Sequence, residues 1–568
     1  MKITKNTFII TATAALLAGC GSTIIPSLSI PMEGSETASA KTADLTEDEL
    51  KAWSLKDLQN DSIPGMGVER TYQEIIKDKA GTTVVVAVID SGIDIEHEDL
   101  KNVMWVNPKE IAGNGIDDDK NGYVDDIHGW NFLGNIVKEN MEYVRIVRRL
   151  KPKYDGKTEA SVSAVDSAEF ALYQKANQEF TKEIAQTTAN VARYSGMLER
   201  LKPAHTAISQ KLGKEDYSKQ DLSGIKNPEG EQKDQIAMLT QMLNYSDDIP
   251  SFIERIQGGV SYFEGRLNSH FDTTTDFRGA VGDDPYDGGM AWSYSWNNRR
   301  WSSNPYYGNN DVDGPDPKKA DAKHGTHVAG IIAAQRNNNI GMNGVAQNVQ
   351  IMAVRAVPDG DEYDKDIANA IRYAVDNGAK VINTSFGKYY STHPQWVWDA
   401  LAYASEKDVL IVNAAGNEGT DLDTIQVYPN DQVGVGAEIS DTFLTVGALN
   451  YKYGSDLLAT FSNYGKVNVD VFSPGVEIWA TTPLNTYEYL QGTSMASPNV
   501  AGVAAMIRSY YPKLSAKQVK QVLMDSGLSV KMDVVLGGDP ENKNSFENIS
   551  TSGKMVNMYN AFIMASKM

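Results

Sequence analysis

The chain of 568 residues has little cysteine, too few cationic side chains to balance its anionic ones, and no long apolar run after its N-terminus. Its single cysteine, Cys20, excludes an intramolecular disulfide, which leaves stability to a large core, with bound cations as a further source. Lys and Arg number 53 against 74 Asp and Glu, a formal charge of −21. Such an acidic surface is repelled by a phosphate backbone, and a nucleic-acid partner is therefore not expected. Without ~18 consecutive apolar residues, the body is expected to be soluble.

The overall composition and the length are those of a large globular protein. Apolar residues make up 41% of the chain and charged residues 22%, which excludes a mainly disordered, collagen-like or polytopic membrane chain. The length exceeds the ~250–300 residues at which a single core stops growing. We expect a large domain with additions, or several domains.

Residues 1–20 have the pattern of an export signal. Two lysines precede the apolar run Phe8–Leu17, which is too short to span a bilayer and ends in Leu-Ala-Gly-Cys. The segment resembles a bacterial lipoprotein signal, which implies that Cys20 becomes a lipidated N-terminus and that residues 21–48 act as a tether. The expected location is the cell envelope, on the outer membrane or cell surface, with the periplasmic side possible. An ordinary signal peptide with an incidental cysteine is the alternative.

The globular sequence alternates buried strands with helices. Continuous apolar and β-branched runs predict strands buried on both faces, at Thr82–Ile89, Val349–Val357, Lys380–Asn383, Val409–Asn413 and Thr442–Ala448. Helical patterns lie between them, at Asp366–Asn377 and Pro394–Lys407. This order predicts an α/β fold, a doubly wound parallel sheet with helices on both faces. In such sheets catalytic groups collect at the carboxyl ends of the strands.

Residues 134–309 interrupt this alternation. An apolar 3–4 spacing predicts a long helix over Asp166–Leu201. Shorter amphipathic helices are expected over Gln235–Leu243 and Ser251–Leu267, with Pro250 breaking the helix between them. We interpret the segment as an inserted α-helical hairpin or small bundle. A packed structural arm and a partner-binding surface are both open as its role.

Three motifs carry side chains suited to nucleophilic catalysis. A buried strand ends at Asp90, His324 starts a helix of small residues, and Ser494 precedes the apolar helix Val500–Tyr510. A serine at a helix N-terminus has free backbone N–H groups beside it that suit an oxyanion. Its hydroxyl needs a base, for which imidazole is suited near neutral pH, and a buried carboxylate fixes the imidazole tautomer.

These motifs, in the order Asp, His, Ser, resemble those of the subtilisin-like serine proteases (subtilases, peptidase S8 family). The resemblance implies a discontinuous subtilisin-like peptidase domain over residues 49–133 and 310–568, with 134–309 inserted. It implies a serine endopeptidase that hydrolyses proteins or peptides through an acyl-enzyme and needs no cofactor for catalysis. Only residues 21–80 precede the first strand, so a separate folding propeptide is not expected.

The resemblance assigns a role to each matching residue. Asp90 orients and charge-stabilises His324, His324 is the general base and then the general acid, and Ser494 is the nucleophile. Asn417, after the predicted strand Val409–Asn413, matches the asparagine whose amide donates to the oxyanion. A plain turn asparagine is the alternative for Asn417.

His327 lies three residues after His324, a spacing that also occurs in zinc sites. No Glu-bearing metalloprotease motif accompanies the pair, so we expect His327 to be a structural neighbour of the catalytic base. An esterase of the α/β-hydrolase type is not favoured, because Ser494 lacks a Gly-x-Ser-x-Gly elbow. A catalytically silent envelope binding protein that acts through the helical insertion is the alternative from another class.

The resemblance also places the substrate. Ser385, Phe386 and Gly387 match the segment whose backbone pairs with an extended substrate, and Ala415 and Gly416 match the opposite wall of the first specificity pocket. The side chain of Phe386 is assigned equally to the pocket wall and to the core. The small residues predict room for a medium or large apolar side chain.

Structural calcium is expected at two places. Asp99 and Asn338 resemble side-chain ligands of the family's tight site, with carbonyls from Ile340 and Met342. The family's glutamine ligand near the N-terminus has no clear counterpart.

A second, acidic loop copies the first half of an EF-hand, with Asp117, Asp119, Asn121 and Asp125 as candidate ligands. The twelfth position is His128 instead of Glu, so a full EF-hand is excluded. A partial calcium loop and a solvated acidic turn are the two interpretations.

Overall fold

The computed structural model describes residues 25–34, 39–277, 294–295, 300–301, 307–433 and 438–568. The predicted signal and Cys20 lie outside the described residues. Within the described residues, no helix combines the length and apolar character that a bilayer crossing requires.

The fold is built on one large, mostly parallel sheet, whose strand order across the described residues is β12-β15-β9-β8-β7-β6-β1-β5-β2. Its strands are β1 (Val84–Asp90), β2 (Gly129–Asn131), β5 (Val349–Arg355), β6 (Val381–Thr384), β7 (Leu410–Ala414), β8 (Phe443–Leu449), β9 (Val471–Pro474), β12 (Leu528–Ser529) and β15 (Lys554–Met555). Only the pairing of β12 with β15 is antiparallel. The five strands expected from the sequence are all present, each within two residues of its predicted start.

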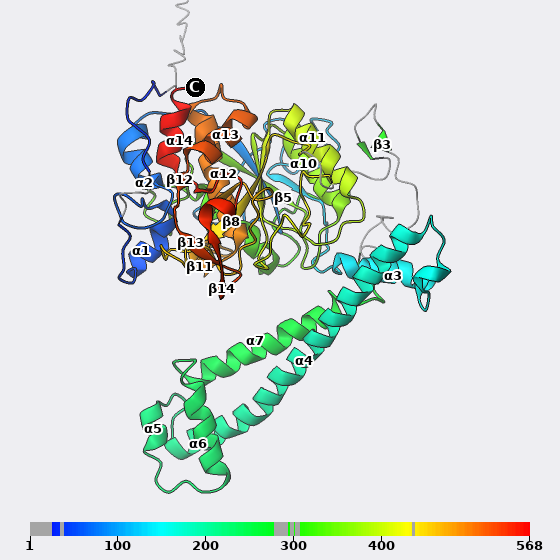
Figure 1. The fold of residues 1–568 in the computed structure, drawn as a ribbon, viewed down its shortest axis with the longest axis vertical. Coiled ribbons are helices and arrows are strands. Elements are labelled where there is room, and N and C mark those ends of the chain that lie inside the picture. Colours follow the sequence, from blue (N-terminus) through cyan, green and yellow to red (C-terminus); the bar gives the residue numbers. More distant parts are fainter. Residues whose placement is uncertain (1–24, 35–38, 278–293, 296–299, 302–306, 434–437) are drawn as a thin grey trace, which may run out of the picture.

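Helices cover both faces of the sheet because successive strand residues point to opposite sides. In β1, Val86 and Val88 face one core, which also contains α9 (Lys323–Ala333), α12 (Thr493–Tyr510), α13 (Ala516–Ser526) and α14 (Met558–Ala565). Ala87 and Ile89 face a second core under α10 (Asp364–Asp376) and α11 (Pro394–Glu406). Figure 1 shows α10 and α11 on one side of the strands and α12 to α14 on the other. The expected doubly wound α/β architecture is confirmed.

Smaller elements surround this core. The described residues also form three two-stranded sheets, β3 (Tyr294–Ser295) with β4 (Arg300–Trp301), β10 (Ile478–Thr482) with β11 (Thr486–Leu490), and β13 (Asp533–Leu536) with β14 (Asp539–Ser545). Two short helices, α1 (Glu47–Ala52) and α2 (Val68–Thr71), precede β1.

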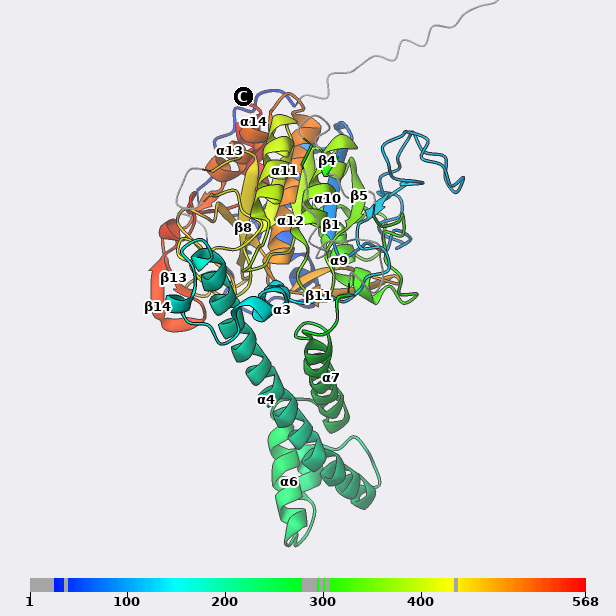
Figure 2. The same ribbon diagram turned by 90° about the vertical axis from the view of Figure 1, so that its right-hand side faces the viewer.

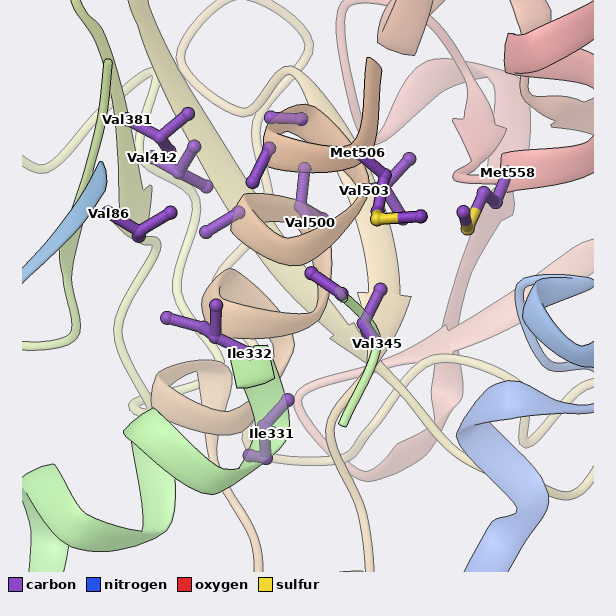
Figure 3. Close-up of a cluster of buried hydrophobic side chains, with 14 of the residues drawn as sticks. Val86, Ile331, Ile332, Val345, Val381, Val412, Val500, Val503, Met506 and Met558 are labelled. Atoms are coloured by element: carbon purple, nitrogen blue, oxygen red, sulfur yellow. The ribbon is translucent and has the colours of Figure 1, made fainter. Parts of the chain in front are cut away.

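Helix α12 is almost entirely buried, and its side chains lie in the first core (Figure 3). Val500, Val503 and Met506 are fully buried, between strand residues such as Val412 and the side chains of α9. The apolar pattern predicts a start at Val500, but the helix begins at Thr493. Pro498 lies inside this helix. Because proline has no N–H, one carbonyl of the preceding turn is left without an intrahelical partner.

A helical arm extends from the body (Figures 1 and 2). It consists of α3 (Glu142–Tyr154), α4 (Ser167–Leu212), α5 (Lys219–Ser223), α6 (Glu231–Met242) and α7 (Ile249–Asn268), with α7 packed along α4. With 46 residues, α4 is ~69 Å long at 1.5 Å per residue.

Two expectations for the arm were wrong in detail. Helix α4 continues through Pro203 to Leu212 and does not end at Leu201, because the apolar stripe that packs it continues with Ala204 and Ile208. Pro250 does not separate two helices: it lies in the first turn of α7, where its missing N–H has no intrahelical acceptor to lose.

Candidate active site

The carboxyl end of β1 and the start of α9 bring Asp90 against His324. The His324 Nδ1 atom lies 2.6 Å from the Asp90 Oδ1 atom. Gly325 permits this approach, since a Cβ atom there would lie 2.2 Å from the Gly92 carbonyl oxygen and 3.0 Å from the Asp90 Cβ atom. The predicted Asp–His pair is therefore formed across 234 residues of sequence.

The electrostatics of the pair favour a protonated Nδ1. The Asp90 side chain is only 2% exposed, whereas the His324 side chain is 38% exposed. Burial of the ring opposes its charging, but the charge and the hydrogen bond of Asp90 outweigh burial and raise the pKa of His324 above its usual value. Since Nδ1 faces the carboxylate, the neutral ring presents Nε2 as its basic atom.

Ser494 is the second residue of α12, next to the free N–H groups of the first helical turn. Its hydroxyl donates to the carbonyl of Ser385 at 2.9 Å, and the hydroxyl of Ser385 donates back to the carbonyl of Ser494 at 2.9 Å. The second bond follows from Pro498, four residues on, which has no N–H to bond the Ser494 carbonyl within the helix. Among the described residues, no hydrogen bond joins the Ser494 hydroxyl to His324. The structure thus joins Asp90 to His324 and holds Ser494 separately.

Asn417 lies beside the start of the same helix. Its side-chain oxygen accepts from the Thr493 N–H at 2.8 Å and from the Thr493 hydroxyl at 3.1 Å. Because the oxygen is occupied, the amide N–H₂ group is directed away from Thr493 and is available as a donor. Thr493 also accepts from the Gly416 N–H at 3.0 Å, so it orients the Asn417 loop. Sequence reasoning missed Thr493, whose only signal was its place between Gly492 and Ser494.

The Asn417 loop requires Gly416. That residue has a φ of +101°, and a Cβ atom there would lie 2.4 Å from the buried Asn463 side chain. A larger residue is therefore excluded on two grounds, backbone strain and steric overlap.

A buried polar network holds the serine helix on the sheet. The Asn383 side chain donates to the Ser385 hydroxyl at 2.9 Å and accepts from the Ser497 hydroxyl at 2.7 Å. Ser497 also donates to the Val412 carbonyl. These groups satisfy one another's hydrogen bonds, which rigidifies the carboxyl end of β6 and the first turns of α12.

The predicted substrate-binding residues line two sides of this centre. Ser385 is buried, Gly387 is exposed, and half-buried Phe386 packs against the core under α10 and α11. Buried Ala415 lies in the wall of a cavity of about 600 Å³, which Val427 also lines. Of the two assignments for Phe386, the core contact is the one the packing shows.

A second cavity, of about 430 Å³, lies against His324. Its walls include Ser91, Val357 and Leu490. The cavity therefore gives the imidazole of His324 access to a space that apolar and polar side chains line together.

His327 does not share a site with His324. It is fully buried, and its Nε2 atom lies 3.1 Å from each of the carbonyl oxygens of Ile478 and Glu488, to which it donates. Burial lowers the pKa of His327 to about 3, so the ring is neutral. The two rings have different partners, which agrees with a structural role for His327.

The residues of the predicted tight calcium site come together. The Asn338 amide donates to Asp99 Oδ1 at 2.6 Å, and the Met342 N–H lies 3.2 Å from Asp99 Oδ2. Ile340 donates its N–H to the Asn338 side-chain oxygen. Asn338 and Met342 therefore contact the Asp99 carboxylate directly, whereas Ile340 contacts the side-chain oxygen of Asn338.

The acidic loop is arranged differently from the EF-hand pattern. Asp117 accepts from backbone N–H groups of the loop, including that of Gly122 at 2.8 Å. Asp125 accepts from the N–H groups of residues 113–115, the shortest bond being 2.8 Å from Gly115.

Within the described residues, Glu110, Asp119 and Asp126 form a group of three carboxylates with oxygen atoms within 4.8 Å of one another. Asn121 donates to both Asp119 and Asp126. Glu110 and Asp126 were missed because sequence spacing pointed to the EF-hand positions, whereas the chain folds back on itself.

Comparisons with known proteins agree with this geometry. The model of the subtilase family matches residues 81–550. The chain is 46% identical over 187 residues to the thermophilic serine proteinase of Bacillus sp. (strain AK1), covering 33% of this chain and 42% of that protein. It is 40% identical over 209 residues to subtilisin DY of Bacillus licheniformis (36% and 71%) and 39% identical over 187 residues to thermitase of Thermoactinomyces vulgaris (33% and 61%). The chain thus covers less than half of the first of these relatives.

The matched range includes Asp90, His324, Asn417 and Ser494, and it extends over most of the chain, on both sides of the helical arm. The chain therefore belongs to the subtilase family.

Proposed function

We propose that the chain is a serine endopeptidase that hydrolyses peptide bonds of proteins through an acyl-enzyme on Ser494. The observation that carries the proposal is the 2.6 Å contact of His324 with buried Asp90. This contact lies at the carboxyl end of a strand, and Ser494 lies in the first turn of α12. Named serine proteinases among the similar proteins support the same reaction class.

The first step uses the neutral form of His324. The Ser494 hydroxyl exchanges its hydrogen bond to the Ser385 carbonyl for one to Nε2 by rotation about its Cα–Cβ bond. As the serine oxygen bonds to the substrate carbonyl carbon, its proton passes to Nε2, and the carbonyl oxygen becomes an oxyanion. The Asp90 carboxylate stabilises the imidazolium that forms.

The oxyanion is stabilised by the Asn417 amide and by backbone N–H at the start of α12. The C–N bond then breaks while His324 returns its proton to the leaving amine. Water, deprotonated by His324, hydrolyses the ester and restores Ser494. Every proton that His324 accepts is passed on, so no cofactor is needed for the proposed cycle.

The proposed substrates are proteins or peptides bound as extended strands. The backbone of Ser385–Gly387 pairs with the substrate on one side, and Ala415 and Gly416 form the wall of the first specificity pocket on the other. Backbone pairing gives affinity with little sequence dependence, and a medium or large apolar side chain is the expected preference.

We further propose that Cys20 is lipidated and attaches the protein to the bacterial cell envelope. The support is the sequence of residues 1–20, with lysines, a short apolar run and a small-residue approach to cysteine. Mass spectrometry of the protein from its native membrane is expected to show an acylated N-terminal Cys20, and an unmodified N-terminus at another residue would contradict this.

Structural calcium is part of the proposal. Asp99 and Asn338 offer carboxylate and amide oxygens, the donors that calcium prefers. In the acidic loop, burial raises the pKa of Asp126 to about 6, and a bound divalent cation would favour its charged form. Chelation is expected to lower the melting temperature and added calcium to restore it. An unaltered melting temperature after verified metal removal would contradict both sites.

The test of the enzymatic proposal is reaction with a fluorophosphonate probe. Full-length protein should be labelled at Ser494, identified by peptide mapping, and labelling should be lost on heating and in His324→Ala. A folded wild-type protein that is not labelled would instead support the catalytically silent binding protein. Cleavage of a proteome-derived peptide library then gives the side-chain preference.

A further inference from the structure

The base of the helical arm packs directly against the segment that follows the predicted substrate-binding strand. Tyr390 is 7% exposed, its ring centroid lies 5.7 Å from that of Tyr143 in α3, and its hydroxyl lies 3.4 Å from the Lys175 carbonyl oxygen in α4. Half-buried Tyr389 belongs to the same apolar cluster. Two consecutive tyrosines thus connect the arm to the chain only a few residues after Ser385.

Lys388, immediately before them, is held by charges from the arm and from the body. Its ammonium lies 3.2 Å from the carboxylate of Glu142 in α3 and 2.9 Å from that of Asp364 in α10. All three side chains are 2% exposed. Buried charges keep such contacts because the loss of the ammonium would leave the Asp364 and Glu142 carboxylates with less cationic compensation, although Arg145 also pairs with Glu142.

From this anchored segment Tyr389 reaches the other side of the cleft. Its hydroxyl donates to Glu418 Oε2, the same oxygen that accepts the Asn417 N–H at 2.8 Å. The Asn463 amide donates to this oxygen at 3.2 Å and to the Tyr389 hydroxyl at 3.3 Å. The residue proposed to stabilise the oxyanion is therefore linked, through one carboxylate oxygen, to a side chain of the arm cluster.

We propose that Tyr389 is a positioning residue, which holds Glu418 and thereby the Asn417 loop, and that the base of the arm holds Tyr389 in place. The proposal rests on the proposed peptidase function. Burial, together with the hydrogen bond to Glu418, raises the pKa of the Tyr389 hydroxyl above its usual value, so the hydroxyl remains a donor in alkaline solution. The helical arm then contributes to catalysis through the geometry of the oxyanion site.

The first experiment compares two neighbouring tyrosines in the full-length protein. Tyr389→Phe keeps the ring in the apolar cluster and removes only the hydroxyl that reaches Glu418. Tyr390→Phe is the matched control, since it removes a hydroxyl that contacts α4. The probes are a fluorophosphonate, scored by its rate of reaction with Ser494, and a peptide p-nitroanilide with Phe before the scissile bond.

We expect Tyr389→Phe to lower both kcat and the fluorophosphonate rate by about tenfold, with KM within about twofold, because the defect concerns the transition state. Tyr390→Phe should stay within about twofold of wild type, and both variants should melt near the wild-type temperature. Equal kcat values for the two variants would overturn the proposal. A purely structural role would lower stability without separating kcat from KM.

The second experiment tests the route through Glu418. Glu418→Ala should reproduce the loss in kcat, and adding Tyr389→Phe to it should cause no further loss, because both changes remove one linkage. Glu418→Gln retains an oxygen that can accept from Asn417 and should recover most of the activity. If the two changes lower kcat independently, so that their factors multiply in the double variant, the proposed linkage of Tyr389 to Asn417 through Glu418 would be contradicted. Failure of the wild-type protein to react with the fluorophosphonate would reject the peptidase function itself, a result separate from the comparison of variants.

Discussion

The α/β body and the helical arm bury their side chains in different ways. The body has two extensive cores on the two faces of one sheet, with α12 enclosed between strands and neighbouring helices. The arm has two small clusters at its ends, one at the base around Tyr143 and Phe271 and one at the tip around Leu239 and Ile208. Long-range packing therefore stabilises the body as one unit, whereas the tip depends on contacts within the arm.

This difference in packing indicates in which regions a substitution should affect function. Asp90, His324, Asn417 and Ser494 all lie on the body, on elements fixed by the large cores. The base of the arm contacts residues 388–392 next to that centre, but the tip extends far from it (Figure 2). Changes in the body and at the base of the arm should therefore affect activity or stability more than changes at the tip, and four predictions test this difference.

The largest effect is expected for Asp90→Asn, which should lower kcat by ~10⁴-fold because the wrong imidazole tautomer is favoured. The pH profile should change as well. In the wild type, kcat/KM should rise as His324 loses its proton, with a midpoint above ~6.5, since Asp90 raises the pKa of His324. Without that carboxylate, burial alone acts on the pKa of His324 and lowers it. The pH midpoint of the residual activity should therefore be lower than in the wild type. A midpoint that stays in place would show that Asp90 does not act on His324.

At the arm base, Lys388→Met should lower the free energy of unfolding by about 3–5 kcal/mol, because Glu142 and Asp364 lose the cation that they share. Thermal or denaturant unfolding measures this. The control is Lys517→Met, which removes the exposed pair with Asp441 and should change stability by less than about 1 kcal/mol. Equal losses of unfolding free energy in the two variants would contradict a special contribution of the arm base to stability.

In the cleft, Asn417→Ala should lower kcat by ~10²–10³-fold, about 2.7–4 kcal/mol, with little change in KM, since its amide donates only to the developing oxyanion. Thr493→Ala is a useful companion. It removes a hydroxyl that Asn417 and Gly416 contact but keeps the backbone N–H, so a smaller loss is expected. Unchanged turnover of purified Asn417→Ala would contradict the oxyanion role.

The smallest effect on activity is expected at the tip. Leu239 is fully buried there, and Leu239→Ala should destabilise the tip by about 2–5 kcal/mol. Hydrogen exchange should become faster in α5 and α6, while exchange in β1 and the kcat value stay as in the wild type. Loss of protection in the body, or a fall in kcat, would show that arm and body unfold together.

Much of the site could be predicted from the sequence because its motifs are local. Asp90 ends a buried run, His324 starts a helix of small residues, and Asn417 follows a predicted strand. Each was therefore placed correctly at the carboxyl ends of the strands. The start of α12 was misplaced because Pro498 normally argues against a helix interior. Its cost is offset here by a partner from another element, Ser385, whose hydroxyl binds the carbonyl left free.

The sequence by itself determined the class of fold, the order of the proposed catalytic side chains and the existence of a long helical arm, because periodicity and short motifs express those features over a few neighbouring residues. Only the tertiary structure decided which distant side chains share a hydrogen bond: Tyr389 with Glu418, Thr493 with Asn417, and Lys388 with Glu142. These pairs form because chain segments far apart in sequence are packed together, and no local pattern records such an approach.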